Sequence, residues 1–268
     1  MSRYETMFSA LDAKNQGAFV PFVMLGDPDK TTSLRIVQAL IDGGADALEL
    51  GFPYSDPIAD GPTIQAASIR ALDSKISPSD CFAIITAVRQ DNPDIPIGLL
   101  LYSNLVLARG IDTFYADAAK AGVDSILIAD VPLREAQRFV DAAKAHGINQ
   151  ILIAPPNATE EALKAIGELS SGYTYLLGRA GVTGAETAAQ TPASELINKL
   201  TQYEVAPPLL GFGISTPKQV AAAINAGAAG AISGSATVNI IAEHLDNVDE
   251  MCAQLRTFVS DMKTATQK

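Results

Sequence analysis

Short apolar runs alternate with amphipathic stretches along the whole chain. The amphipathic stretches repeat hydrophobic side chains at the spacing of one helix face, whereas the apolar runs are rich in Leu and β-branched residues and are too short for helices. Runs that are apolar throughout are typical of strands buried on both faces of a parallel sheet. We expect eight strands, over residues 18–25, 47–51, 95–102, 125–129, 150–154, 173–177, 209–212 and 229–233. We expect helices over residues 33–42, 62–72, 78–90, 111–121, 133–145, 160–169, 193–203, 217–226 and 236–245, with flanking helices over 2–14 and 248–264.

A weak internal repeat supports this order of elements. Gly44, Gly122, Gly147 and Gly227 each follow a predicted helix and come shortly before a predicted strand. Glycine ends a helix at low cost because it adopts the left-handed conformation easily. Eight such units without a long linker favour a single (β/α)8 TIM barrel domain over residues 1–268, with an extra N-terminal helix that can cover the barrel floor. A doubly wound open sheet is the alternative fold.

Charge and cysteine usage restrict the setting. The net charge of −11, without any basic run, lacks the positive footprint that nucleic-acid binding requires. Cys81 and Cys252 are isolated, which fits a reducing cytoplasm better than a disulfide scaffold. The charged N-terminus does not resemble a signal peptide. The uncharged stretch 219–242 is rich in Ala and Gly and carries polar residues, so we do not expect it to span a membrane.

Candidate acid–base chemistry follows the second predicted strand. Because strand side chains alternate, Glu49 faces the barrel interior if Leu48 and Leu50 face the helices. Burial there would raise the pKa of the carboxyl group and suit it to general acid–base catalysis. A structural alternative is a glutamate hydrogen-bonded to a neighbouring loop.

Four aspartates follow predicted strands. Asp56 and Asp60 lie in the long loop after the second strand, where each is either a catalytic candidate or a turn former beside Pro57 or Gly61. We interpret Asp27 and Asp130 as residues that organise their loops.

Glycine-rich loops follow the last three predicted strands. They contain Gly178–Gly184, Gly211–Ser215 and Ser233–Ser235, and a helix beginning at Ser235 would direct free N–H groups outward. The last two loops of a (β/α)8 barrel are a common phosphate site. Tight packing of short loops is the structural alternative.

Other chemistries have little support in the sequence. His146 and His244 lie late in predicted helices, away from the strand ends, so we expect no metal site. No nucleophile elbow occurs, and no lysine lies in a predicted strand, which argues against Schiff-base aldol cleavage. The residues alone therefore indicate an acid–base lyase or isomerase that acts on a phosphorylated metabolite.

Three motifs resemble those of the tryptophan synthase α subunit family. They are the strand-two segment LELGFPYSDPIADGPTIQ at residues 48–65, RAGVTG at 179–184 and GFGIS at 211–215, and the similarity runs from Tyr4 to about Thr264. The resemblance implies retro-aldol cleavage of indole-3-glycerol phosphate to indole and glyceraldehyde 3-phosphate in tryptophan biosynthesis. It gives Glu49 the main acid–base role and Asp60 the contact with the indole N–H.

The resemblance also implies the remaining site residues. Arg179 to Gln190 resemble a mobile lid that excludes water and helps to order Asp60, with Arg179 and Thr183 in it. The family more often has Ser at Gly178, at the start of this segment. The phosphate would meet Gly184, Gly213, Gly234 and Ser235, and the indole and glycerol pocket would be lined by Phe22, Leu100, Leu127, Tyr175, Thr183, Phe212 and Ile232. For the apolar members, packing in the core is the alternative role.

The family works as an αββα assembly with a pyridoxal-phosphate β subunit. The resemblance places the contact at the loop of residues 53–60 and near Asn104 and Arg109, and implies no cofactor in the α chain itself. The alternatives are a free-standing indole-releasing lyase, a non-catalytic regulatory or scaffold subunit, and another phosphate-binding barrel such as an isomerase or epimerase. An epimerase would need metal-binding histidines at the strand ends, and intact Glu49 and Asp60 argue against a scaffold.

Overall fold

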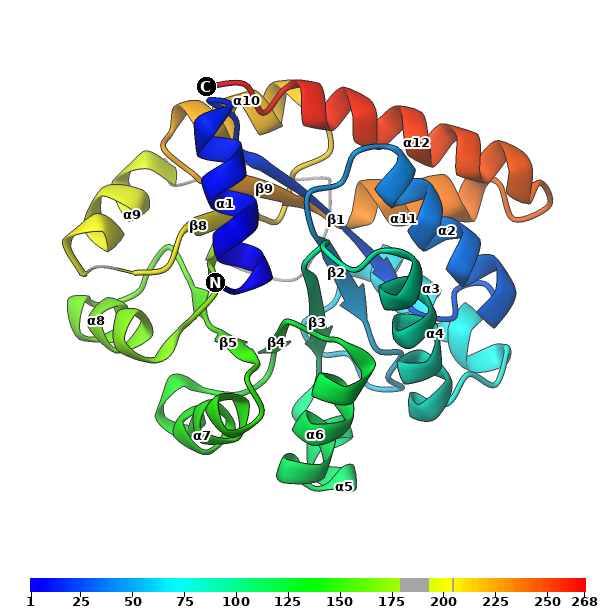
Figure 1. The fold of residues 1–268 in the computed structure, drawn as a ribbon, viewed down its shortest axis with the longest axis horizontal. Coiled ribbons are helices and arrows are strands. Elements are labelled where there is room, and N and C mark those ends of the chain that lie inside the picture. The colour runs from blue at the N-terminus through cyan, green and yellow to red at the C-terminus, as the bar shows by residue number, and fades with distance from the viewer. Residues whose placement is uncertain (179–192, 204) are drawn as a thin grey trace.

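Nine parallel strands form one sheet in the part of the chain that the computed structural model describes, which is residues 1–178, 193–203 and 205–268. Their order is β5-β4-β3-β2-β1-β9-β8-β7-β6, and only Leu152 separates the two edge strands in sequence. The edges therefore meet and the sheet curls into a nearly closed barrel, surrounded by helices (Figure 1). The barrel prediction is confirmed. The strands are β1 (Ala18–Met24), β2 (Leu48–Gly51), β3 (Ile97–Leu101), β4 (Ser125–Ile128), β5 (Asn149–Ile151), β6 (Ile153–Ala154), β7 (Thr174–Leu177), β8 (Pro208–Gly211) and β9 (Gly230–Ser233).

The prediction of one strand over residues 150–154 is wrong, because this segment is divided at Leu152. The first half pairs with β4 and the second half pairs with β7. At the division the Leu152 N–H donates to the Ser170 hydroxyl, at 3.3 Å, and not to a neighbouring strand. The break lets one short segment serve both edges of the sheet.

Helices follow the strands in the expected order. Six of the twelve described helices begin at a side chain that accepts their free N–H groups. For example, Asp29 caps Thr31 and Thr32, and α2 therefore begins earlier than the expected residue 33. The helices are α1 (Arg3–Ala13), α2 (Lys30–Asp42), α3 (Pro62–Asp73), α4 (Pro78–Asp91), α5 (Ser103–Arg109), α6 (Ile111–Ala121), α7 (Gln137–Ala145), α8 (Glu160–Leu169), α9 (Ala193–Leu200), α10 (Pro217–Asn225), α11 (Ser235–Glu243) and α12 (Val248–Thr264), with 3-10 turns at Leu133–Glu135 and Thr201–Tyr203. The short helix α5, directly after β3, was not expected. No helix in the described residues is both long and apolar enough to cross a membrane.

The core has two layers, which follow from the alternation of side chains along each strand. Leu48 and Leu50 belong to the layer between the strands and the helices, whereas Ala47 belongs to the layer inside the barrel. The inner layer also contains Tyr4 from α1, which crosses one end of the strands (Figure 1). The Tyr4 hydroxyl is hydrogen-bonded to the Ser125 hydroxyl at the start of β4, at 2.8 Å. Helix α1 therefore covers the barrel at the amino ends of the strands, as expected.

Two aspartates of the internal repeat join neighbouring strands at this floor. Asp46 accepts the Phe19 N–H and Asp124 accepts the Ile97 N–H, both at 2.8 Å. Each is also paired with a cation: Lys263 lies 2.8 Å from Asp46, and Arg89 lies 2.7 Å from Asp124. The floor is thus closed by helix α1 and by neutralised carboxylates, and the carboxyl ends of the strands are left for a site.

Candidate active site

One cavity opens at the carboxyl ends of the strands. Its volume is about 390 Å³, which is in the range of small-molecule sites. Every pocket residue expected from the sequence that the structure describes lines it: Phe22, Glu49, Asp60, Leu100, Leu127, Tyr175, Phe212, Gly213, Ile232, Gly234 and Ser235. Arg179, Thr183 and Gly184, and the whole expected lid of residues 179–190, lie outside the described residues.

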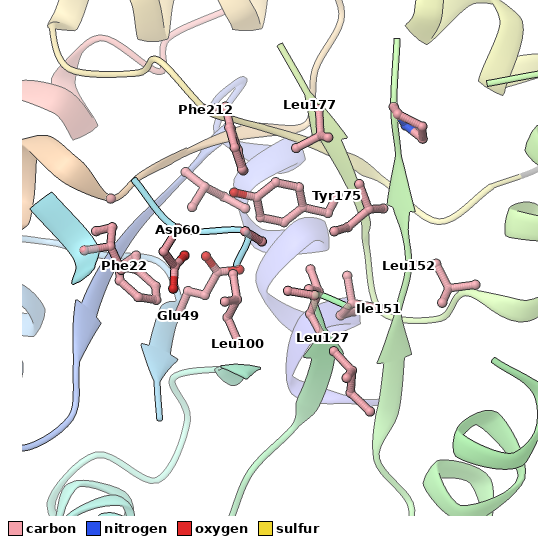
Figure 2. A pocket seen from close by; sticks show the side chains of 18 of the residues that line it. Phe22, Glu49, Asp60, Leu100, Leu127, Ile151, Leu152, Tyr175, Leu177 and Phe212 are labelled. Atoms are coloured by element: carbon pink, nitrogen blue, oxygen red, sulfur yellow. The ribbon is translucent and has the colours of Figure 1, made fainter. Parts of the chain in front are cut away.

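Glu49 points into the barrel from the middle of β2 (Figure 2). It lies beside Phe22 on β1 and beside Gly98 on β3 in the strand register. The side chain is 2% exposed, and one Glu49 carboxyl oxygen accepts a hydrogen bond from the Tyr173 hydroxyl at 3.1 Å. Burial raises the pKa of Glu49 to about 8, although the Tyr173 hydrogen bond opposes this change. Glu49 therefore holds its proton at neutral pH.

Asp60 reaches the same cavity from the loop between β2 and α3. The loop turns tightly before it, with the Asp60 N–H donating to the Pro57 carbonyl at 3.0 Å. The Asp60 side chain is 6% exposed, and burial raises its pKa to about 6, against a hydrogen bond from Tyr102. Asp60 is thus mainly ionised at neutral pH, whereas Glu49 is mainly protonated. Figure 2 shows both carboxyl groups among the apolar side chains of the cavity.

Neither of these two carboxyl groups takes part in an ion pair among the described residues. Two buried acids of different pKa in one apolar cavity are a typical arrangement for general acid–base catalysis. The described residues also contain no group of His, Cys, Asp and Glu side chains that could hold a metal ion.

The other aspartates of the strand ends have different roles. Asp27 accepts two hydrogen bonds from Arg70, each at 2.7 Å, and so ties its loop to α3. Asp130 accepts the Ser103 N–H and hydroxyl, at 2.7 and 2.8 Å. Both residues organise loops, as predicted. Asp56 is exposed and accepts the Ser55 hydroxyl, so it does not line the cavity.

Helix α11 begins at the cavity. Gly234 precedes it without a side-chain cap, so the first N–H groups of α11 have no capping side chain. Gly213 lies next to them in the cavity lining, with a φ of +83°, which favours glycine. Free N–H groups at the positive end of a helix form a suitable site for a phosphate.

Glycine at position 211 makes room for Tyr175. A Cβ atom at this position would lie 2.2 Å from the Tyr175 hydroxyl oxygen, so any other residue would displace the ring. The Tyr175 and Phe212 rings then meet edge to face, with centroids 6.2 Å apart, in the wall of the cavity.

Sequence reasoning missed several residues of the site. The sequence predicts no role for Tyr173, which donates to Glu49, or for Tyr102, whose hydroxyl lowers the pKa of Asp60. Tyr173 could have been found, because it lies two residues before Tyr175 and so shares its face of the strand. The cavity is also lined by Ala59, Ile64, Ile128, Ala129, Val131, Leu133, Ile151, Leu152, Ile153, Pro155, Leu177, Ile214 and Ala236.

The fold and the cavity define the class of the protein: a (β/α)8 barrel with two buried carboxyl groups and an uncapped helix N-terminus in one cavity at the carboxyl ends of its strands. Comparison with known proteins gives the family. The family model of the tryptophan synthase alpha chain matches residues 8–267, and the chain belongs to this family.

Individual relatives agree with this assignment. The chain is 58% identical to the tryptophan synthase alpha chain of Aliivibrio fischeri, over 100% of both chains. A structure of Mycobacterium tuberculosis tryptophan synthase superimposes with a TM-score of 0.90 at 31% identity, covering 100% of this chain and 99% of the other. A chain from a study of mutual activation in the tryptophan synthase α2β2 complex of Pyrococcus furiosus superimposes with a TM-score of 0.81 at 34% identity, covering 92% and 98%.

Proposed function

We propose that this chain cleaves indole-3-glycerol phosphate to indole and glyceraldehyde 3-phosphate, as the α subunit of a tryptophan synthase. The observation that carries the proposal is the pair of buried carboxyl groups, Glu49 and Asp60, that face one apolar cavity without a cation among the described residues. Membership of the tryptophan synthase alpha chain family supports the same reaction.

Glu49 is the general acid and base of the proposed reaction. With its pKa raised to about 8 by burial, it carries a proton that it can donate to C3 of the indole ring. It can then accept the proton of the glycerol hydroxyl next to the bond that breaks. As that carbon–carbon bond breaks, its electron pair returns to the indole ring and the hydroxyl carbon becomes the aldehyde. One group of intermediate pKa can perform both transfers.

Asp60 stabilises the positive charge that develops on the indole nitrogen when C3 is protonated. The charge requires an ionised acceptor close to the N–H group. With a pKa of about 6, Asp60 is ionised at neutral pH and still buried enough for the interaction to be strong.

The rest of the cavity fits the two ends of this substrate. The N-terminus of α11, with Gly213, Gly234 and Ser235, would hold the phosphate. The indole ring would lie against the apolar wall of the cavity. The residues of this wall are Phe22, Leu100, Leu127, Tyr175, Phe212 and Ile232.

We further propose a β subunit as partner, with activation in the complex. The Pyrococcus furiosus relative is described as part of an α2β2 complex with mutual activation. In this chain, the loop of residues 53–60 and α5 expose apolar side chains, with Ile58 76% and Leu107 43% exposed. Arg109, at the end of α5, is paired with Asp117 at 2.6 Å.

The cytoplasm is the proposed location, and it is consistent with two free buried thiols, Cys81 and Cys252. We also propose that residues 1–268 act as one domain. The contacts between α2 and α12, and the bridge between Gln16 and Gln267, join the two ends of the sequence.

The experiment is an assay of indole release from indole-3-glycerol phosphate by the purified chain, with and without a β subunit. We expect Glu49→Gln and Asp60→Asn each to lower kcat about 10²- to 10⁴-fold. Asp56→Asn is the matched control in the assay without the β subunit. It removes a negative charge from the same loop as Asp60 but outside the cavity, so it should leave kcat of the free chain unchanged. Absence of cleavage by the wild-type chain, even with the β subunit, would refute the proposal.

A further inference from the structure

Tyr102 lies between the cavity and the outer surface of the barrel mouth. It follows β3 directly and forms the N-cap residue of α5. Its side chain is 2% exposed. The Tyr102 hydroxyl oxygen accepts the N–H of Ala59, the residue before Asp60, at 3.0 Å.

The same hydroxyl also serves the Asp60 carboxyl group. Because its oxygen accepts from Ala59, its single proton remains available to the nearby Asp60 carboxyl group, whose pKa the Tyr102 hydroxyl lowers against the effect of burial. A hydrogen bond to an ionised carboxylate is stronger than one between neutral groups. The backbone before Asp60 and the Asp60 side chain are therefore held by one phenol group.

On its other side, Tyr102 is connected to the surface. Its ring stacks on the ring of Tyr54, with centroids 5.4 Å apart and an angle of 29° between the planes. The Tyr54 hydroxyl accepts a hydrogen bond from Asn104 at 2.5 Å, and Asn104 is exposed. A continuous series of contacts thus runs from the surface at Asn104, through two stacked rings, to Asp60.

We propose that Tyr102 is a positioning residue that fixes Asp60 in the cavity and transmits to it the contacts that a partner protein makes at Tyr54 and Asn104. This inference rests on the proposed function and deepens it, because it names a route by which the partner regulates the site. A partner that presses on Tyr54 displaces the stacked Tyr102 ring, and the hydroxyl that holds Asp60 moves with it.

Three other titratable groups lie near Asp60 and Tyr102. In the described part of the chain they are Glu49 from β2, Tyr175 from β7 and Asp130 after β4. Two of them are acids, which oppose a second negative charge nearby. The hydroxyl of Tyr175 also lies in the cavity, and its pKa is raised by burial and by both carboxyl groups.

The first test removes only the hydroxyl, with Tyr102→Phe. The ring and its stack on Tyr54 remain. We expect the titration midpoint of Asp60, followed by ¹³C-carboxyl NMR of the free chain and assigned with Asp60→Asn, to rise by about one pH unit, since the charged form loses its donor. The acid limb of the pH profile of kcat/KM should move to higher pH by the same amount. The matched control is Tyr115→Phe, which removes another buried hydroxyl, one that donates to Gln150 on the helix side of β5.

The second test measures activation by a saturating β subunit. We expect Tyr102→Phe to reduce the fold-activation of kcat about fivefold or more, and Tyr54→Ala, which removes the stacked ring, to reduce it similarly. Tyr115→Phe should keep the wild-type activation. A purely structural role would lower the stability of Tyr102→Phe and of Tyr115→Phe alike, without changing the Asp60 midpoint.

Three outcomes decide the inference. An Asp60 midpoint that is the same in Tyr102→Phe and in the wild-type chain overturns it, and so does unchanged activation in Tyr102→Phe. If Tyr102→Phe does not fold, the ¹³Cζ signal of Tyr102 in the wild-type chain replaces the first test, and it must titrate with the Asp60 midpoint or the inference fails. Failure of the proposed function is distinguishable, because the wild-type chain would then release no indole while the NMR titrations are still measured.

Discussion

The buried carboxyl groups at the two ends of the barrel differ in their partners: those at the floor are paired with cations, whereas those of the cavity at the mouth are not, among the described residues. At the floor, Asp124 accepts hydrogen bonds from the side chains of Arg3 and Arg89 and from the Ile97 N–H, at 2.7 to 2.8 Å. The negative charge of Asp124 is therefore fully compensated. At the mouth, Glu49 has a single hydrogen-bond partner, the Tyr173 hydroxyl, among the described residues. Both acids are nearly inaccessible to water, with exposures of 9% for Asp124 and 2% for Glu49. Burial without a neighbouring cation therefore raises the pKa of Glu49, whereas the carboxylate of Asp124 is paired with two arginines.

The largest expected effect is on the free energy of unfolding, which should change in opposite directions when a buried carboxyl group is replaced at the floor and at the mouth. We expect Asp124→Asn to lower the free energy of unfolding by about 3 kcal/mol, because Arg89 remains largely buried without its carboxylate. Glu49→Gln should instead raise the free energy of unfolding at alkaline pH, relative to the wild-type chain. Since the pKa of Glu49 is about 8 in the folded chain and 4.5 is its ordinary value, the wild-type chain loses stability as the pH rises between these values.

Urea unfolding at pH 5 and pH 8 measures both variants. Between these two pH values Glu49→Gln should gain roughly 2–4 kcal/mol relative to the wild-type chain, at about 1.4 kcal/mol per pH unit. Asp124→Asn should be destabilised at both. Equal loss of stability in both variants at pH 8 would show that the mouth is built for stability like the floor.

The pH dependence of the reaction is the next largest effect. Activity should require Asp60 ionised and Glu49 protonated, and their pKa values are about 6 and about 8. We therefore expect a bell-shaped kcat/KM profile with a maximum near pH 7, falling about tenfold per pH unit beyond either limb. Steady-state assays of the wild-type chain from pH 5 to pH 9 test this. A flat profile over that range would contradict the assignment of the two acids.

A smaller effect is expected at the single partner of Glu49. Tyr173→Phe removes a hydrogen bond that lowers the pKa of Glu49, so that pKa should rise further. The alkaline limb of kcat/KM then moves to higher pH by roughly half to one unit, and activity at pH 9 rises a few-fold relative to that at pH 7. The acid limb should stay in place. Movement of both limbs would mean that Tyr173 supports the whole cavity and not Glu49 alone.

The smallest effect is expected at the exposed rim of the floor. Arg3 is paired with Asp124, but its side chain is 40% exposed, and Arg89 remains as a second partner. Arg3→Ala should therefore cost at most about 1 kcal/mol of stability and leave kcat/KM unchanged. Thermal unfolding together with the indole assay tests both statements. A clear loss of activity would show that floor and mouth are coupled through α1.

The inward direction of Glu49 could be predicted because a strand has only two faces. Once Leu48 and Leu50 are assigned to the helix side, Glu49 must face the interior. The break at Leu152 could not be predicted in the same way. Residues 150–154 form an uninterrupted strand-like run, and nothing in it marks Leu152, whose N–H bonds to the Ser170 hydroxyl 18 residues further along the chain.

Helix α5 and the role of Tyr102 also depend on distant contacts. The seven residues of α5 are too few for a clear periodicity, and the helix begins at Ser103 after Tyr102, which caps no N–H with its side chain. The interactions that make Tyr102 notable, with Ala59 and Tyr54, cross from one loop to another. An isolated tyrosine at the end of a strand is otherwise typical of core packing.

The pairing of β1 with β9 has a consequence for the synthesis of the protein. Phe19 and Val20 in β1 lie opposite Ala231 and Ile232 in β9, so one of the first strands to leave the ribosome stays unpaired along this edge until almost all of the sequence has been translated. An apolar strand edge that is open for so long invites pairing with other nascent chains.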